Sequence, residues 1–276
     1  MGRERARDHA DAGRLLELAA AAARAAGRLL AERFANAPRG VRRKADRGGL
    51  VSDADRAAEA RILSVILAAR PGDAIVAEEG GRRDGRSELT WVVDPLDGTD
   101  NHLSGGPHWA VSVACLDRAG GLVGAVHDPL RDETFRASRG GGAWLGERRL
   151  AVAATADPDG AVLATALSAW PDEREGDLER IRRALAAGAR VRVSGSAALD
   201  LAWVAAGRLG GCFQCGLQPW DTAAGALLVE EAAGVVLELP RADGEPGIVA
   251  GAPGLARRVS TLLTPAPPPA GDGGRG

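Results

Sequence analysis

The sequence predicts a mixed fold, α+β in its first half and α/β in its second. The first half opens with two helical segments and continues into a run of antiparallel strands, from WAVSVACLD (109–117) to AWL (143–145). The second half alternates strands and helices, which predicts a layered βα arrangement. A length of 276 residues, 45% of them hydrophobic, suits one large domain or two fused halves around a sizeable core.

The first half is expected to contain two helices followed by strands. Ala and Leu at helical spacing predict a long helix over 11–35, and a basic, glycine-containing loop over 36–50 follows. The second helix covers 52–70, with Asp53 or Asp55 as its cap and Pro71-Gly72 as its end. Further along we expect a strand at 73–79, a loop at 82–87 and a strand at 89–94. The last of these strands should stop at Asp94, because Pro95 cannot continue a central strand.

The alternation in the second half gives four strands and three helices. The expected strands are 161–167, 190–195, 210–216 and 235–239, and the expected helices are 177–188, 197–209 and 220–234. Residues 1–9 and the Pro/Gly-rich end, 264–276, are expected to be disordered tails.

Composition excludes several classes of function. The net charge of -2 favours neither a nucleic acid polymer nor a membrane surface as partner. No apolar run is long enough for a transmembrane span, and we expect no secretory signal. Three cysteines fit a reducing cytosol, so we expect a cytoplasmic protein. Cys212 and Cys215 form a C-x-x-C without a second pair, which leaves ordinary thiols favoured over a zinc or redox site.

Several acids follow apolar runs, where strands should end. Asp94 follows LTWVV, Glu78 and Glu79 follow AIVA, and Asp221 opens an Ala-rich helix. Ligands of α/β proteins bind at such carboxyl ends of strands. Clustered carboxylates without matching bases raise one another's pKa, and a bound cation is the usual way to keep them ionised. Carboxylate and carbonyl oxygens favour Mg²⁺ or Mn²⁺ over Zn²⁺.

Gly98 and Thr99 follow the acids directly in DPLDGT (94–99). A helix starting there would point free N–H groups at the same cations, which suits a phosphate. Cations, an anion hole and a hydroxyl together make a phosphoryl-transfer site. The alternative is an Asx-rich turn, but the upstream Glu pair and the downstream WDTAAG (220–225) favour a site.

Five segments resemble the inositol monophosphatase family of Mg²⁺-dependent, lithium-sensitive phosphatases. They are VSDAD (51–55), AEEG (77–80), WVVDPLDGTDN (91–101), VSGSAALDLAWVAAGR (193–208) and PWDTAAGALLVEEAAG (219–234). The resemblance runs from about Ala10 to Leu263. It implies one domain over 10–263, with an α+β half at about 10–150 and an α/β half at 151–263. It also implies a layered αβαβα sandwich and a homodimer.

The resemblance assigns roles to the acids. Glu78, Asp94 and the carbonyl of Leu96 would bind a first Mg²⁺, and Asp94, Asp97 and Asp221 a second. A third, weaker ion would use Glu78 and water, so two or three Mg²⁺ are implied, with Mn²⁺ as a substitute.

The same resemblance assigns the residues around the phosphate. Thr99 and Asp55 would activate the attacking water. The backbone N–H groups of Gly98 and Thr99, together with Asp97, would bind the phosphate end of the substrate. The implied reaction is phosphoric monoester hydrolysis by in-line attack of water, without a phosphoenzyme. Ser196 and Ala197 match a segment whose backbone lies near the substrate. Lys44 matches a catalytic mobile-loop lysine, with a solvated basic loop (VRRK) as the alternative reading.

The substrate stays open at this stage. Inositol-1-phosphate is the first expectation, but Gln214 stands where many family members have a Glu that contacts inositol hydroxyls. Gln keeps the hydrogen bonds and loses the charge. Histidinol phosphate, a nucleotide 3'-phosphate, fructose-1,6-bisphosphate and a specialised nucleoside or aminosugar phosphate are therefore alternatives. A non-catalytic binding protein on this scaffold is a remote alternative, because every expected metal ligand is present.

Overall fold

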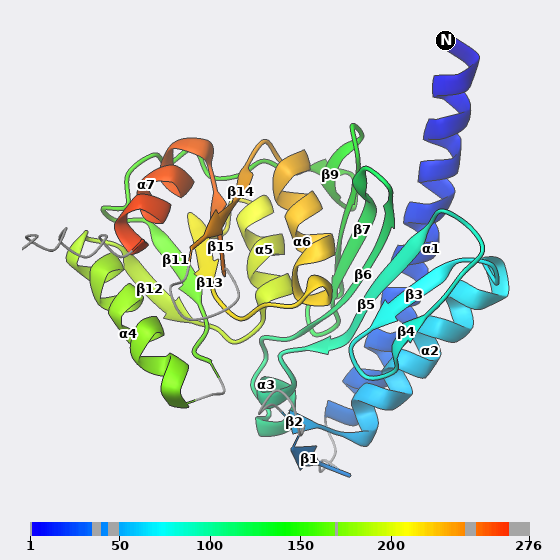
Figure 1. Cartoon of the computed structure of the whole chain (residues 1–276), viewed down its shortest axis with the longest axis horizontal. Helices are drawn as coiled ribbons and strands as arrows, with labels where there is room; N and C mark the ends of the chain where they lie inside the picture. Colours follow the sequence, from blue (N-terminus) through cyan, green and yellow to red (C-terminus); the bar gives the residue numbers. More distant parts are fainter. Residues whose placement is uncertain (1, 35–39, 44–49, 169–170, 241–246, 265–276) are drawn as a thin grey trace, which may run out of the picture.

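Two β-sheets and three helix layers alternate through the structure, a computed structural model that describes residues 2–34, 40–43, 50–168, 171–240 and 247–264 (Figure 1). The outer helices α1 (Gly2–Phe34) and α2 (Asp53–Ala69) cover one face of the larger sheet. The central helices α5 (Ala197–Ala205) and α6 (Pro219–Glu231) fill the space between the sheets. On the far side, α4 (Pro171–Ala186) and α7 (Pro253–Leu263) cover the smaller sheet. This αβαβα order confirms the predicted fold class.

The larger sheet has eight strands in the order β10-β9-β8-β7-β6-β5-β3-β4. All neighbours are antiparallel except β3 and β5, which run parallel. Its strands are β3 (Ala74–Ala77), β4 (Gly81–Arg83), β5 (Thr90–Asp97), β6 (Ala110–Asp117), β7 (Gly120–Asp128), β8 (Glu133–Ser138), β9 (Gly142–Leu145) and β10 (Arg148–Arg149). The antiparallel run predicted for the first half is therefore confirmed.

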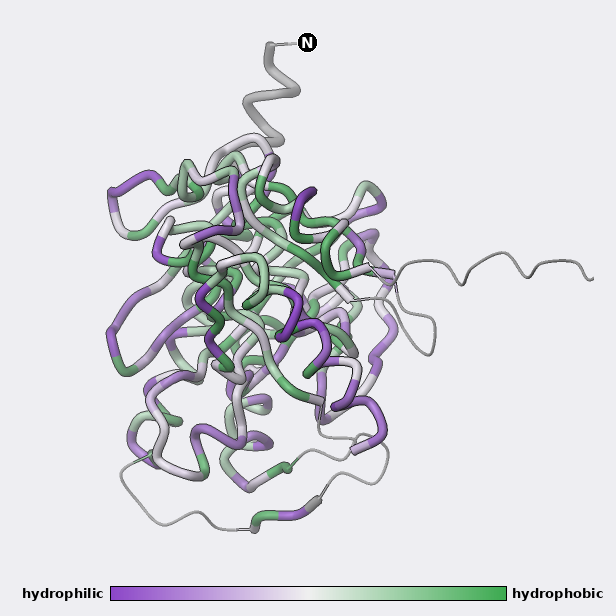
Figure 2. Tube along the Cα trace, turned by 90° about the vertical axis from the view of Figure 1, so that its left-hand side faces the viewer, coloured by the Kyte–Doolittle hydropathy of each residue, from purple (hydrophilic) through white to green (hydrophobic). Residues whose placement is uncertain are grey.

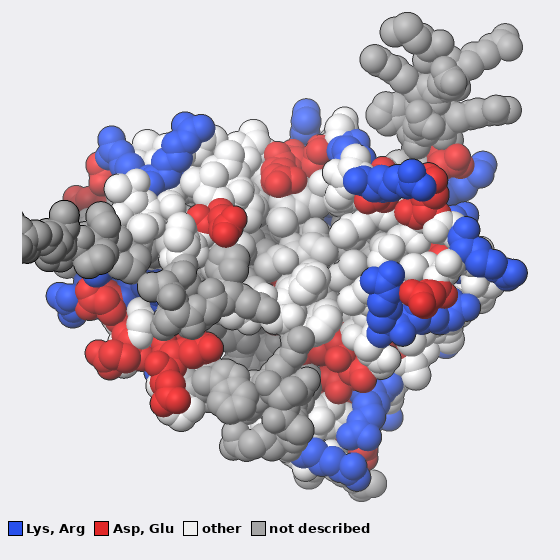
Figure 3. Space-filling view, viewed as in Figure 1, with Lys and Arg blue, Asp and Glu red and all other residues white. Residues whose placement is uncertain are grey.

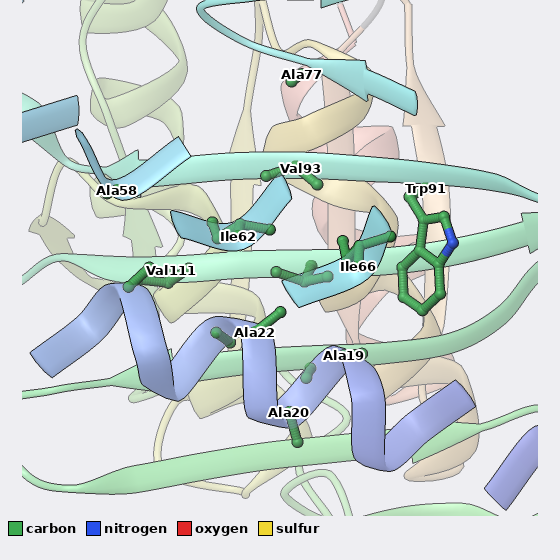
Figure 4. Close-up of a cluster of buried hydrophobic side chains, with 14 of the residues drawn as sticks. Ala19, Ala20, Ala22, Ala58, Ile62, Ile66, Ala77, Trp91, Val93 and Val111 are labelled. Carbon is green, nitrogen blue, oxygen red and sulfur yellow. The ribbon is translucent and has the colours of Figure 1, made fainter. Parts of the chain in front are cut away.

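The near-continuous apolar character of β5 and β6 follows from burial of both sheet faces. Trp91 and Val93 of β5 pack under α1 and α2, whereas Val92 between them faces α5 and α6. Alternate residues of a strand point to opposite faces, so a strand covered on both sides needs apolar residues at every position. Figure 4 shows Ile62 and Ile66 of α2 beside Val93 and Trp91, and small alanines of α1 against the sheet.

The smaller sheet has five strands in the order β12-β11-β13-β15-β14. It is mixed, because β11 runs parallel to β12 and β13, and β15 runs antiparallel to β13 and β14. Its strands are β11 (Val162–Thr165), β12 (Arg190–Val193), β13 (Gly211–Gln214), β14 (Val235–Leu239) and β15 (Gly247–Gly251). A two-stranded hairpin, β1 (Arg42–Arg43) with β2 (Leu50–Val51), and the short helix α3 (Thr99–Ser104) complete the described elements.

Hydrophobic segments gather in the body of the molecule and hydrophilic ones on its outer loops (Figure 2). On the face that Figure 3 shows, the described Lys and Arg side chains alternate with Asp and Glu along the rim and form no single broad basic area. No described helix combines the length and the apolar character that a membrane crossing needs.

Several elements differ from the predictions, among them α4, which begins at Pro171 although the helix was expected to start at 177. α1 begins at Gly2, although residues 1–9 were expected to be a disordered tail; extending an existing helix through good helix formers such as Arg, Glu and Ala costs little. The N-cap of α2 is Ser52, whose Oγ accepts a hydrogen bond from the N–H of Ala54 at 3.1 Å. Short strands occupy part of the loops expected at 36–50 and 82–87. Finally, β15 and α7 were not predicted. Residues 265–276 lie outside the described residues.

Candidate active site

The centre of the site is a break in the pairing of β5 with β6. Asp94 pairs with Ser112 and Asp97 pairs with Ala110, so two residues of β5 stand opposite one residue of β6. This bulge takes Pro95 out of the hydrogen-bond ladder, where its missing N–H costs nothing. The prediction that β5 stops at Asp94 was therefore wrong, because the strand resumes at Asp97. The bulge also turns the chain so that the N–H of Leu96 donates to Asp94 Oδ1 at 2.9 Å.

Three predicted metal ligands meet at this bulge. Asp94, Asp97 and Asp221 each offer an oxygen atom, and these atoms all lie within 4.8 Å of one another. Asp221 comes from the first turn of α6, as predicted, and its Oδ2 accepts the N–H of Gln218 at 2.6 Å. Glu78 follows the end of β3, and its charge acts on all three aspartates. Residues far apart in the sequence thus form one cluster of negative charge.

Burial and mutual repulsion raise the pKa of each aspartate. For Asp94, burial and then Glu78 and Asp97 raise the pKa well above its usual value. Burial raises the pKa of Asp97 to about 6, against the hydrogen bonds from Ser196 and Ala198, which lower it. Burial and then Asp97 raise the pKa of Asp221 to about 7. Ionising all three together at neutral pH is therefore costly in the protein alone.

The cluster fits a hard divalent cation. Within the described parts of the chain, no Arg or Lys forms an ion pair with Asp94, Asp97 or Asp221. The available donors are carboxylate oxygens and the Leu96 carbonyl, which are the ligands that Mg²⁺ and Mn²⁺ prefer. A cation among these oxygens would replace the missing positive charge.

Thr99 and Asp55 form the second part of the site. The Thr99 hydroxyl lies 3.0 Å from Asp55 Oδ1 and 3.0 Å from the Leu96 carbonyl oxygen. The other oxygen of Asp55 accepts the N–H of Ser52 at 2.8 Å and its hydroxyl at 2.6 Å. Asp55 is fully buried, so these contacts fix its orientation. The structure thus places the expected Thr99–Asp55 pair beside the carbonyl of an expected metal ligand.

Gly98 connects the bulge to α3. It is the N-cap of that helix with φ +94°, a left-handed conformation that favours glycine. A Cβ at this position would lie 2.9 Å from the His108 carbonyl oxygen. The glycine is therefore required by the backbone, and it starts a helix at Thr99, as the sequence suggested.

Helix α5 positions Asp97 from the second half of the chain. Asp97 Oδ2 accepts the Ser196 hydroxyl at 2.6 Å and the N–H of Ala198 at 2.7 Å. Ser196 is fully buried, and its hydroxyl orients an expected metal ligand, a role that the sequence did not suggest. Asn101 adds a second link, because its Nδ2 donates to the carbonyls of His108 at 2.7 Å and Ser194 at 2.8 Å. These contacts join the two halves at the site.

Two of the remaining predicted site residues, Ala197 and Gln214, belong to elements of the second half. Ala197 is buried in the first turn of α5, and Gln214 is half-buried at the end of β13, opposite Ile248. Lys44 lies outside the described residues. Asp100 is exposed on α3 and is not part of the ligand cluster of Asp94, Asp97 and Asp221.

Two other motifs, the C-x-x-C and the glycine-rich RGGG at 139–142, have structural explanations. Cys212 packs between the sheets, whereas Cys215 packs on the opposite side of β13, so the C-x-x-C thiols do not converge. Burial also raises the pKa of the Cys212 thiol, and a thiol that stays protonated is a poor metal ligand. The glycine loop at 139–142 holds the Glu231 carboxylate through the N–H groups of Gly140 and Gly142, at 2.7 and 2.8 Å.

The histidines also have structural roles. His102 is buried between Phe34 and Trp109, with Nε2 3.2 Å from the Leu30 carbonyl oxygen. His108 contacts Asp200 at 2.9 Å and packs edge-on against Trp203. His127 Nδ1 lies 3.0 Å from the Thr134 hydroxyl, a partner that the sequence did not indicate.

Two sheets around a central helix pair, with a carboxylate cluster at a strand bulge, define a layered α+β protein with a candidate cation site. The chain belongs to the inositol monophosphatase family, whose family model matches residues 11–261. The Nus factor SuhB of Vibrio cholerae is 42% identical over 229 residues, 81% of this chain and 85% of that protein. The Nus factor SuhB of Pseudomonas aeruginosa is 40% identical over 264 residues, 92% of this chain and 97% of that protein.

Solved structures agree with this assignment. The inositol monophosphatase from Anabaena (Nostoc) sp. superposes with a TM-score of 0.80 at 34% identity, covering 93% of this chain and 97% of that one. The extragenic suppressor protein suhB from Bartonella henselae gives a TM-score of 0.84 at 36% identity, covering 90% and 98%. The layered fold is therefore that of the family.

Proposed function

We propose that this protein is a Mg²⁺-dependent phosphomonoesterase that hydrolyses a small polar phosphate ester. One observation supports this proposal above the others. The aspartate cluster and the Thr99–Asp55 pair meet at residues 94–99, because the Thr99 hydroxyl contacts both Asp55 and the carbonyl oxygen of Leu96, each at 3.0 Å. Cation ligands and a group that can take a proton from water thus lie next to each other, as phosphate ester hydrolysis requires.

The proposed cation ligands divide into two overlapping sets. Glu78, Asp94 and the Leu96 carbonyl would hold one Mg²⁺, and Asp94, Asp97 and Asp221 a second. A third, weaker ion would be bound by Glu78 and water. When bound, Mg²⁺ supplies Lewis acidity for water and neutralises the charge of the phosphate and the leaving oxygen. Mn²⁺ is the expected substitute.

The protein's own groups would handle the water and the phosphate. Asp55, oriented by Ser52, accepts the Thr99 hydroxyl hydrogen, which leaves the Thr99 oxygen free to accept a water proton. The backbone N–H groups of Gly98 and Thr99 would donate to the phosphate at the start of α3. Ser196 and Ala198 hold the carboxylate of Asp97 in place through two hydrogen bonds. Lys44, Ala197 and Gln214 are proposed to lie around the substrate.

Inositol-1-phosphate is the first proposed substrate. Support comes from the family and from a solved relative described as inositol monophosphate-bound SaIMPase-II, which superposes with a TM-score of 0.72 at 26% identity. The neutral Gln214 weakens this choice relative to the alternatives named above. Lithium sensitivity is proposed on the family's account.

A substrate panel tests the proposal. Phosphate release would be measured with inositol-1-phosphate, histidinol phosphate, 3'-phosphoadenosine-5'-phosphate, fructose-1,6-bisphosphate, and nucleoside and aminosugar phosphates. Each would be run with Mg²⁺, with EDTA and with added Li⁺. Mg²⁺-dependent release from one compound well above the rest is the expected result. Failure to bind Mg²⁺ or Mn²⁺ at all would refute the proposal.

A second candidate comes from the names of the relatives. Several proteins about 40% identical to this chain are called Nus factor SuhB, so a Nus-factor role is an alternative. Expressing this chain in Escherichia coli that lacks its own SuhB tests that candidate, and failure to restore the wild-type phenotype would count against it. The homodimer and the cytoplasmic location also remain predictions, which light scattering and cell fractionation would test.

A further inference from the structure

Helix α2 carries a second buried acid one turn after Asp55. Glu59 is 6% exposed and lies four residues further on, so both carboxylates point from the same face of the helix. In the described part of the chain, no Arg or Lys forms an ion pair with Glu59. A buried, unbalanced carboxylate is costly unless it holds hydrogen-bond donors.

The donors belong to the turn that follows β3. Glu59 Oε2 accepts the backbone N–H of Glu79 at 2.9 Å, across twenty residues of sequence. The backbone of Gly80 also lies against the carboxylate, because a Cβ there would be only 2.6 Å from Glu59 Oε1. The carboxylate of Glu59 therefore supports the turn at residues 78–80, whose first residue is the expected metal ligand Glu78.

We propose that Glu59 is a positioning residue for Glu78, and that it acts by fixing the backbone of the 78–80 turn. This inference rests on the proposed metal role of Glu78. The backbone N–H of Glu78 itself donates to the carbonyl oxygen of Val93 on β5 at 3.2 Å. The turn is thus held between β5 and α2, and the Glu78 carboxylate is directed at the bulge.

Helix α2 would thereby position two parts of the site. Asp55 holds Thr99, and Glu59 holds the turn that carries Glu78. Because a helix is rigid over one turn, it fixes the distance between the water-orienting pair and the Glu78 ligand. Groups that orient a metal ligand without touching the metal commonly contribute 10–100-fold to metal affinity.

Glu59→Gln is the test variant. An amide has nearly the same shape, but it presents an NH₂ group in place of one acceptor oxygen and carries no charge. We expect roughly 10-fold weaker Mn²⁺ binding in calorimetric titrations of metal-free protein. The Mg²⁺ concentration for half-maximal phosphate release should rise by a similar factor, while the substrate KM at saturating Mg²⁺ stays unchanged. Asp53→Asn is the matched control, because it removes one exposed charge from the same helix.

The outcomes separate this inference from the proposed function. Wild-type protein that binds no Mn²⁺ would refute the function itself. Wild-type protein that binds Mn²⁺, beside a folded Glu59→Gln variant of equal affinity, would refute only the positioning role. Equal loss in Glu59→Gln and Asp53→Asn would indicate a general charge effect and would also refute it. If Glu59→Gln does not fold, the same titration on Glu59→Asp decides, since its shorter side chain must weaken Mn²⁺ binding several-fold.

Discussion

Replacing Asp221 with Asn should stabilise the metal-free protein, and more so at pH 8 than at pH 5. Asp221 has its pKa raised to about 7 in the folded state, from a usual value of 3.8. Between these values the unfolded chain ionises and the folded protein stays protonated, so the carboxyl destabilises the fold increasingly as pH rises. Above about pH 7 the penalty is complete. Asn carries no such penalty, and its side-chain oxygen can still accept the N–H of Gln218.

The size of the expected stabilisation follows from the part of this pH range, between the two pKa values of Asp221, that lies above pH 5. At 1.36 kcal/mol per pH unit, ionisation from pH 5 to about 7 gives a gain for the variant of roughly 3 kcal/mol. The variant also lowers the charge repulsion on Asp94 and Asp97, whose pKa values are raised as well, and this effect acts in the same direction. Burial lowers the pKa of His102 and His127, which opposes this trend, but both proteins share that effect and it cancels in the difference.

Thermal unfolding in EDTA at the two pH values measures this difference. For a chain of this size, roughly 3 kcal/mol corresponds to a relative rise in Tm of about 5–10 °C for the variant. Added Mg²⁺ should stabilise the wild type strongly at pH 8 and the variant weakly, because bound cation removes the repulsion only where the carboxylate exists. If the stability of the variant relative to the wild type stays constant or decreases from pH 5 to pH 8, the description of the site as an unbalanced acid cluster is wrong.

The remaining predictions concern ligands, supports and thiols. Asp94→Asn should abolish phosphate release while circular dichroism shows an unchanged fold, because an amide cannot replace a shared anionic ligand; surviving activity would show that the ligand assignment is wrong. Ser196→Ala removes the 2.6 Å bond to Asp97 and should weaken Mn²⁺ binding about 10-fold, with Ser196→Thr largely restoring it in the same calorimetric titration. Cys215→Ala should leave activity and metal content unchanged in reducing buffer, since Cys212 and Cys215 pack on opposite faces of β13; bound zinc lost on substitution would contradict this.

The positions of the candidate metal ligands were predictable because local sequence rules mark them, whereas their roles as ligands came from the family resemblance. Asp94, Glu78 and Asp221 stand where an apolar run ends or a helix begins, and those positions follow from periodicity alone. The division into an antiparallel half and an alternating half was also accessible from the sequence patterns, whereas the order of the layers came from the family resemblance. By contrast, β15 is a short apolar run between glycines whose partners β13 and β14 lie on either side, so only the folded sheet identifies it. Helix α7 did carry a signal, with Pro253 in its first turn and buried residues at helical spacing from Leu255 to Leu263.

The supports of the site were not predictable, because each one is a contact between distant segments. Ser196 reaches Asp97 across 99 residues, and Glu59 reaches the N–H of Glu79 across twenty. The prediction that the strand ends before Pro95 failed for a related reason. A bulge depends on the partner strand, and a rule about single strands does not include that partner. These supports oppose the repulsion of the acids by holding them in place from α2, α5 and α6. Packing keeps Asp94, Asp97 and Asp221 together against their repulsion, and a bound cation removes that repulsion. A substitution that removes one of these charges should therefore raise the stability of the metal-free protein and weaken cation binding.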